Sequence, residues 1–85
     1  MKKVWKFPVT LGDHLEYALP ADSQALMFGI QDGNPTLWVI VDPDKPLVIY
    51  RFRLAGTGHP LGDEVGRYIG SCFQGPFVWH LFEEL

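Results

Sequence analysis

The sequence predicts an all-β domain, a small antiparallel sandwich or partly open barrel of about six to seven short strands with helix minor or absent. Two observations lead to this prediction. Seven prolines and nine glycines interrupt the chain so often that no amphipathic helix of ordinary length fits between them. Short segments rich in β-branched and aromatic residues recur between these interruptions. The segments expected as strands are residues 3–8, 14–19, 25–31, 36–42, 47–55, 68–74 and 77–83.

Turn residues separate the three middle segments. Asp32–Pro35 and Asp42–Pro46 carry Asp, Asn, Gly and Pro at the positions that reverse turns prefer. We therefore expect residues 25–31, 36–42 and 47–55 to form an antiparallel meander joined by two hairpins.

Two further connections follow the meander. Gly75–Pro76 is expected to close a third hairpin between residues 68–74 and 77–83. The connection from Gly56 to Arg67 is the longest in the chain. A loop of that length in a compact domain often has a function.

Alternation assigns the two faces of the strand predicted over residues 47–55. One set of side chains is apolar and is expected in the core, while the other set faces outward. The outward set includes two arginines, so a local positive patch is expected on the strand that leads into the long loop. The core set is Val48, Tyr50, Phe52 and Leu54, and the outward set is Ile49, Arg51 and Arg53.

The chain carries more apolar surface than a domain of this size buries readily. Of its 85 residues, expected to form one domain over residues 1–85, 47% are hydrophobic and 14% aromatic. Residues 37–41 are apolar on both faces of their strand, as are residues 77–79 with Leu81 and Phe82 further along. Strands of this kind are covered on both sides, so we expect a homo-oligomer in which another copy covers part of the sheet.

Charge and composition exclude several classes of partner. The net charge of −3 provides no positive field for DNA. The single cysteine, Cys72, has no partner for an intramolecular disulfide, and no apolar run is long enough to span a bilayer. Met1–Lys3 is followed by the mixed segment Val4–Phe7 rather than by the apolar region of a signal peptide. We therefore expect a cytoplasmic protein that binds neither DNA nor a membrane.

The segment Gly56–Pro60 concentrates polar chemistry between two strongly β-forming segments. Gly56 and Gly58 allow positive φ and close approach of the backbone, and the proline fixes the exit of the loop. Thr57 and His59 offer hydrogen-bond donors and acceptors. Two interpretations are open: a wide turn in which these side chains bond nearby backbone, or a loop that cradles an anion or a nucleotide.

Basic and aromatic residues near the loop complete the candidate site. Arg51, Arg53 or Arg67 would balance the charge of an anionic ligand. Tyr68, beside Arg67, is a candidate to stack on a base, whereas Trp79 lies in a strongly apolar strand and is expected to pack in the core. The candidate ligand-binding residues are Arg51, Arg53, Gly56, Thr57, Gly58, His59, Arg67 and Tyr68.

No pattern typical of catalysis or metal binding is present. His14, His59 and His80 are far apart in sequence, so no metal site is expected, and His80 is expected as a partly exposed strand residue. Cys72 is expected as a buried thiol, and neither serine lies in a Gly-x-Ser-x-Gly elbow. The long loop lacks the Gly-Lys-Ser/Thr ending of an NTPase phosphate loop. We therefore expect no enzymatic activity and no cofactor.

Several short motifs together resemble a known group of proteins. These are Trp5–Pro8, Leu37–Trp38, Val41–Pro43, Gly56–Pro60 and Tyr68–Gly70. On these motifs the chain resembles, over nearly its whole length, a family of short uncharacterised proteins encoded mostly by bacteriophages and prophages. The family has no assigned catalytic residues to transfer. The resemblance implies a phage-encoded accessory protein that acts in the host bacterial cytosol.

Two functions from different classes fit these observations. The leading hypothesis is a homo-oligomeric, non-enzymatic sponge that sequesters a small anionic ligand, a cyclic or linear nucleotide signal of host immunity. The Gly56–Pro60 loop is expected to form one wall of a binding site at the homo-oligomer interface. The alternative is a protein-interaction module that inhibits or adapts a host or phage protein through an exposed aromatic surface.

Overall fold

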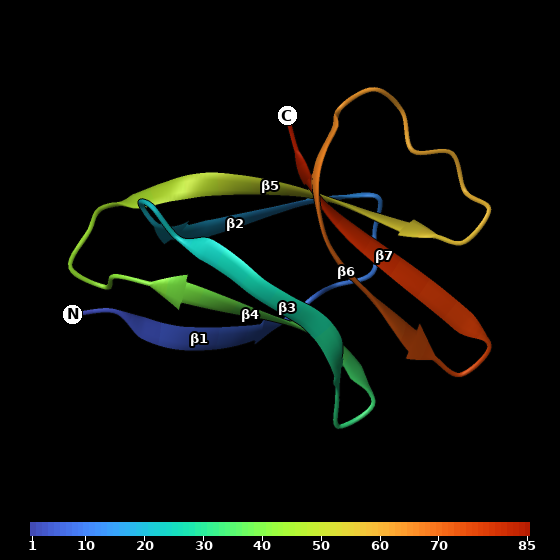
Figure 1. The fold of residues 1–85 in the computed structure, drawn as a ribbon, viewed down its shortest axis with the longest axis horizontal. Helices are drawn as coiled ribbons and strands as arrows, with labels where there is room; N and C mark the ends of the chain where they lie inside the picture. The colour runs from blue at the N-terminus through green and yellow to red at the C-terminus, as the bar shows by residue number, and fades with distance from the viewer.

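Seven antiparallel strands in two sheets make up the computed structural model, which describes residues 1–85 (Figure 1). The all-β prediction is confirmed, and the two sheets form an open sandwich without helix. One sheet has three strands in the order β1-β4-β3, and the other has four in the order β2-β5-β7-β6. The strands are β1 (Lys3–Pro8), β2 (His14–Pro20), β3 (Gln24–Gln31), β4 (Asn34–Val41), β5 (Leu47–Gly56), β6 (Val65–Gln74) and β7 (Phe77–Glu84).

Two of the three predicted hairpins are confirmed. Asp32 and Gly33 join β3 to β4 with positive φ angles of 50° and 79°, the combination that a type I′ turn requires. Gly75 has a φ of 57° in the turn between β6 and β7, where a type II′ turn places glycine first. These tight turns set the register of each hairpin.

The predicted hairpin between β4 and β5 is wrong. Residues 42–46 do form a local turn, in which Lys45 N donates to Asp42 O at 3.1 Å. However, β4 pairs with β1 and β3, while β5 pairs with β2 and β7. The turn therefore carries the chain from one sheet to the other. Turn residues predict a reversal of direction, but whether the two strands then pair or face each other depends on which surfaces must be buried.

The hydrophobic core lies between the two sheets. The inward side chains of β4 meet those of β5 and β7, and the most deeply buried are Leu37 and Leu81. Alternation along β5 predicted the second half of its core set, because Phe52 and Leu54 are buried. Val48 at the other end of the strand is exposed, since the sandwich is open there. The ten residues of the core are Val9, Leu19, Phe28, Leu37, Val39, Val41, Phe52, Leu54, Cys72 and Leu81.

The strand β6 begins at Val65, three residues earlier than residue 68 where the sequence predicts it. Its pairing with β7 is irregular between Val65 and Gly70. Arg67 and Tyr68 therefore belong to the sheet rather than to the long loop, which spans residues 57–64. The structure contains no helix long and apolar enough to cross a membrane.

Truncation of the core tests this packing. Leu81→Ala should lower the free energy of unfolding by about 2–5 kcal/mol, because the cavity left by a fully buried leucine adds to the lost burial. Urea denaturation measures this change. Leu47→Ala is the matched control, since Leu47 is 65% exposed and its truncation should change stability by no more than about 0.5 kcal/mol. Equal effects of the two substitutions would contradict the assigned core.

Candidate functional site

The long loop over residues 57–64 is anchored by Arg53 of β5. Arg53 is only 7% exposed. Its Nη2 donates to Pro60 O at 2.7 Å, and its Nη1 donates to Asp13 O at 3.2 Å and to Leu54 O. One guanidinium thus ties the long loop and the β1–β2 connection to the outer face of β5.

The prediction that Arg53 projects outward with Arg51 to form a positive patch is wrong. Alternation places both side chains on the outer face of β5, but the loop folds over that face and covers Arg53. Carboxylate oxygens of Asp13 and Glu64 lie 3.7 Å and 3.8 Å from its guanidinium nitrogens. Arg53 therefore serves the structure and is not available to a ligand.

The other two arginines of the predicted site form ion pairs with carboxylates of the sheet. Arg51 is exposed, and its Nε donates to Glu16 Oε1 at 3.2 Å. Arg67 Nη2 donates to Glu83 Oε1 at 3.1 Å. The structure therefore brings together the loop residues of the prediction, but not the arginines expected to supply charge.

The glycines of the loop have the conformational roles that the sequence suggested. Gly58 has a φ of 90°, within a tight turn in which His59 N donates to Gly56 O at 3.0 Å. Thr57 N donates to Val78 O at 3.2 Å, which holds the start of the loop against β7. The N–H of Gly58 makes no hydrogen bond within the protein, so it is available to a ligand.

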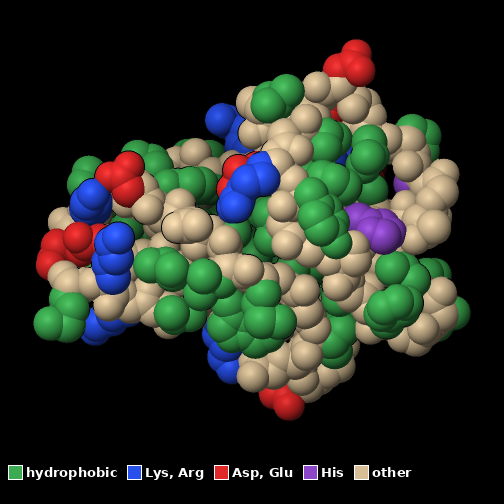
Figure 2. Space-filling view, viewed as in Figure 1, with side chains coloured by type: hydrophobic (Ala, Val, Ile, Leu, Met, Phe, Trp, Pro, Cys, Tyr) green, Lys and Arg blue, Asp and Glu red, His purple; other side chains and the backbone are tan.

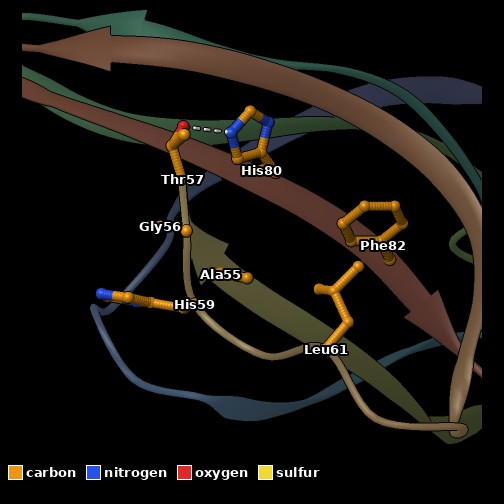
Figure 3. Close-up of a pocket in the computed structure, with 8 residues that line it drawn as sticks. Ala55, Gly56, Thr57, His59, Leu61, His80 and Phe82 are labelled. Atoms are coloured by element: carbon orange, nitrogen blue, oxygen red, sulfur yellow. Dashed lines mark hydrogen bonds between the residues drawn. The ribbon is translucent and has the colours of Figure 1, made fainter.

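A hollow of about 190 Å³ lies between the loop and the outer face of β7 (Figure 3). We call it the loop hollow. Leu61 and Phe82 face each other across it, and Thr57 and His80 meet at its rim. The hollow is lined by Ala55, Gly56, Thr57, Gly58, His59, Leu61, His80 and Phe82.

A chain of hydrogen bonds runs from the rim of the loop hollow across two strands. Thr57 Oγ1 bonds His80 Nε2 at 2.8 Å, His80 Nδ1 bonds Ser71 Oγ at 2.6 Å, and Ser71 Oγ bonds the Tyr68 hydroxyl at 2.7 Å. A neutral imidazole donates through one nitrogen and accepts through the other, so the direction of the chain sets whether Thr57 donates or accepts. The Tyr68 ring also packs 5.5 Å from that of Phe82.

Sequence reasoning found Thr57 and Tyr68 but missed the two residues that connect them. His80 is half-buried, as expected, but its bonds to Thr57 and Ser71 were not predicted. The Gly75–Pro76 turn could have predicted that Ser71 and His80 are neighbours. A two-residue turn pairs Gln74 with Phe77, and counting back three steps pairs Ser71 with His80, as observed.

A second hollow, of about 380 Å³, lies on the other side of the loop, and we call it the end hollow. His59 turns away from Leu61 and Phe82 in Figure 3 and lines this second space. Trp79 packs against the core as predicted, yet it is half-buried and also lines the hollow. The hollow is lined by Gly56, Thr57, His59, Pro76, Phe77, Val78 and Trp79.

The side chains around both hollows define what chemistry is present. No Lys, Arg, Asp or Glu lines either space, so the lining carries no fixed charge. No three His, Cys, Asp or Glu side chains converge where a metal ion could bind. The Cys72 thiol is buried in the core, and this burial raises its pKa. The arrangement can donate and accept hydrogen bonds and can pack against flat apolar groups.

Comparison with known proteins identifies the family of the chain. A model of a domain of unknown function, DUF7352, matches residues 1–85. The chain belongs to this family. The expectation of an uncharacterised domain family is therefore confirmed over the whole chain. No curated protein and no solved structure matches it.

The anchoring role of Arg53 is testable. Arg53→Gln should lower the free energy of unfolding by about 2 kcal/mol, because loss of the guanidinium leaves the buried Leu54 carbonyl and two part-buried carbonyls without their donor. It should also speed amide hydrogen exchange in residues 57–64. Arg51→Gln removes only an exposed ion pair and should cost less than about 1 kcal/mol. If both variants behave alike in denaturation and exchange, Arg53 is not the anchor.

The Cys72 thiol gives a second test of the core. Because burial raises its pKa, less thiolate is present at a given pH than in the unfolded chain. Labelling of the folded protein by a thiol reagent at pH 8 should be at least about tenfold slower than in denaturing urea. Equal rates in both conditions would show that Cys72 is accessible in the fold.

Proposed function

We propose that this protein is a non-enzymatic binding protein that captures a small ligand at the Gly56–His59 segment. The observation that carries the proposal is that two hollows share one wall, formed by Gly56, Thr57 and His59. Arg53 anchors this wall through Pro60, which reduces the entropy lost when a ligand binds. A single ligand can therefore contact both sides of the segment.

The ligand is proposed to be a nucleotide signal with few charges. The Gly58 N–H and the Thr57 hydroxyl would bond phosphate or ribose oxygens of this ligand. Because no arginine or lysine lines the hollows, a polyphosphate would find no compensating charge there. A cyclic or linear nucleotide with one or two phosphates fits this lining better.

Binding without turnover is the chemical part of the proposal. Both ring nitrogens of His80 are bonded within the protein, to Thr57 and Ser71, so the imidazole is occupied as a structural link. Cys72, the strongest nucleophile in the chain, is buried and its pKa is raised. These contacts support a role in holding a ligand over a role in converting it.

The biological setting comes from the resemblance to short phage proteins. In that setting the protein would act as a counter-defence sponge in the cytosol of the bacterial host. Homo-oligomer formation remains part of the proposal, through the outer face of the three-stranded sheet. There Trp38 and Ile40 are half-buried, and Val4 and Met27 beside them are exposed.

A protein-interaction module is the second candidate function. The observation that favours it is the exposure of aromatic side chains on the β6–β7 hairpin, where Phe73 is 75%, Phe77 57% and Tyr68 54% exposed. Exposed large aromatic residues are enriched at protein interfaces.

Titration with cyclic and linear nucleotides tests the leading proposal. Calorimetric heat and a rise in melting temperature are expected, since ligand at about 100 times Kd stabilises the native state by about 2.7 kcal/mol. Thr57→Val should weaken binding about two- to tenfold through loss of one hydrogen bond. Thr10→Val applies the same change at an exposed threonine outside both hollows and should leave affinity unchanged.

Titration, capture of a protein partner and recovery of the bound nucleotide together distinguish the alternatives. Absence of heat and of a melting shift with every nucleotide would contradict the ligand proposal. A stoichiometric protein partner retained by both Thr57→Val and His59→Ala would favour the interaction module. The bound nucleotide should be recovered intact after prolonged incubation, whereas accumulation of a product would show that the protein is an enzyme.

A further inference from the structure

Two aromatic rings stack on one another at the mouth of the end hollow. The rings of Phe77 and Trp79 are stacked, with centroids 5.6 Å apart and planes inclined by 21°. Phe77 is 57% exposed, so burial in the core does not account for its position. We call this pair the aromatic shelf.

Hydrogen bonds through Gln74 hold the aromatic shelf in place. Trp79 Nε1 donates to Gln74 Oε1 at 2.9 Å, and Gln74 Nε2 donates to Gly33 O at 3.1 Å. The indole is thus fixed through β6 to the turn between β3 and β4. A surface ordered before binding loses less entropy when a ligand packs on it.

The His59 ring approaches the shelf across Gly56. A Cβ atom built at Gly56 would lie 3.0 Å from His59 Cε1 and 3.4 Å from Trp79 Cζ3, so both rings approach the same glycine. The absence of a side chain at Gly56 allows this arrangement. The end hollow is therefore lined by the His59 imidazole as well as by the Phe77 and Trp79 rings.

The charge of the surroundings restricts what can occupy this space. None of the seven lining residues is acidic, and none is Lys or Arg. On the face shown in Figure 2, Lys and Arg side chains gather mainly over the half of the molecule that holds the N-terminus. At the end where the β6–β7 hairpin lies, hydrophobic side chains surround a histidine. The complementary occupant is uncharged, flat and able to accept stacking, and a volume of about 380 Å³ lies within the range of small-ligand sites.

We propose that the end hollow is a stacking subsite for a nucleobase, in which the base stacks on the Phe77–Trp79 pair and His59 lies at its edge. This inference rests on the proposed function, since it assigns the base of the same ligand whose phosphate or ribose meets Thr57 and Gly58. Stacking accepts any base, because every base presents a π face. The subsite therefore selects nucleotides as a class, and discrimination between bases should be weak.

The test uses the wild-type protein and the four common ribonucleoside monophosphates as probes. In two-dimensional NMR spectra the indole N–H signal of Trp79 should shift on titration. The indole signals of Trp5 and Trp38, which lie on the other sheet, should not. Ribose 5-phosphate, which lacks a base, should leave all three signals in place.

Calorimetry on two matched variants completes the test. Phe77→Ala should raise the Kd for the monophosphates by about five- to 150-fold. Phe73→Ala removes another exposed phenylalanine of the same hairpin, one that lines neither hollow, and should change Kd less than twofold. Both positions are exposed, so both variants should fold.

The outcomes separate this inference from the function on which it rests. If the monophosphates bind, Thr57→Val weakens them, and neither the Trp79 signal nor the Phe77→Ala variant responds, then the stacking subsite is wrong and the ligand-binding function stands. If ribose 5-phosphate binds as tightly as the monophosphates, the base makes no contact and the subsite is equally overturned. If cyclic nucleotides bind but no monophosphate does, the NMR titration is repeated with the cyclic nucleotides. A shift of the Trp79 indole signal then supports the stacking subsite, and no shift overturns it. Failure of every nucleotide to bind overturns both proposals.

Discussion

The guanidinium of Arg53 joins three segments of the chain on the outer face of the four-stranded sheet. A buried cation costs several kcal/mol in desolvation, and here the cost is offset by carbonyl oxygens of Asp13, Leu54 and Pro60. The loop over residues 57–64 therefore lies along β5 and β7 instead of extending into solvent. The loop hollow exists because this loop crosses above Phe82, and the loop begins with the wall shared by both hollows. The candidate site thus depends on a residue that contacts no ligand.

The unequal size of the two sheets explains where the site lies. The three-stranded sheet ends at β3, which packs beside β6, and a Cβ at Gly70 would lie 3.3 Å from the side chain of Phe28. Beyond this contact the hairpin of β6 and β7 extends past the core (Figure 1). Its distal side chains therefore have no opposite sheet to pack against. Aromatic residues there remain half-buried or exposed, next to the long loop that leaves the same end of β5.

Local sequence patterns predicted the strands well because each pattern reflects a local constraint. Glycine at a positive φ closes the β3–β4 and β6–β7 turns, and the β6–β7 turn also sets the register that joins Ser71 to His80. The same reasoning failed at residues 42–46, where a sound turn leads into the opposite sheet. It also failed at Arg53. Alternation correctly placed this side chain on the outer face of β5, but the prediction that it is exposed there was wrong. In both cases the outcome depended on a segment distant in sequence.

Composition, turn residues and alternation were enough to establish an all-β chain of short strands and to single out Gly56–His59 as its most polar loop. These properties depend on interactions between residues that are close together in the chain, so they can be predicted from a single sequence. Long-range packing settled which arginine is buried and which strands face each other. It also turned the His59 and His80 side chains to opposite sides of the loop. Burial of apolar surface chose among many arrangements of the same strands, and that choice determined which polar groups met. The loop was recognisable in the sequence, and its two hollows were created by the fold.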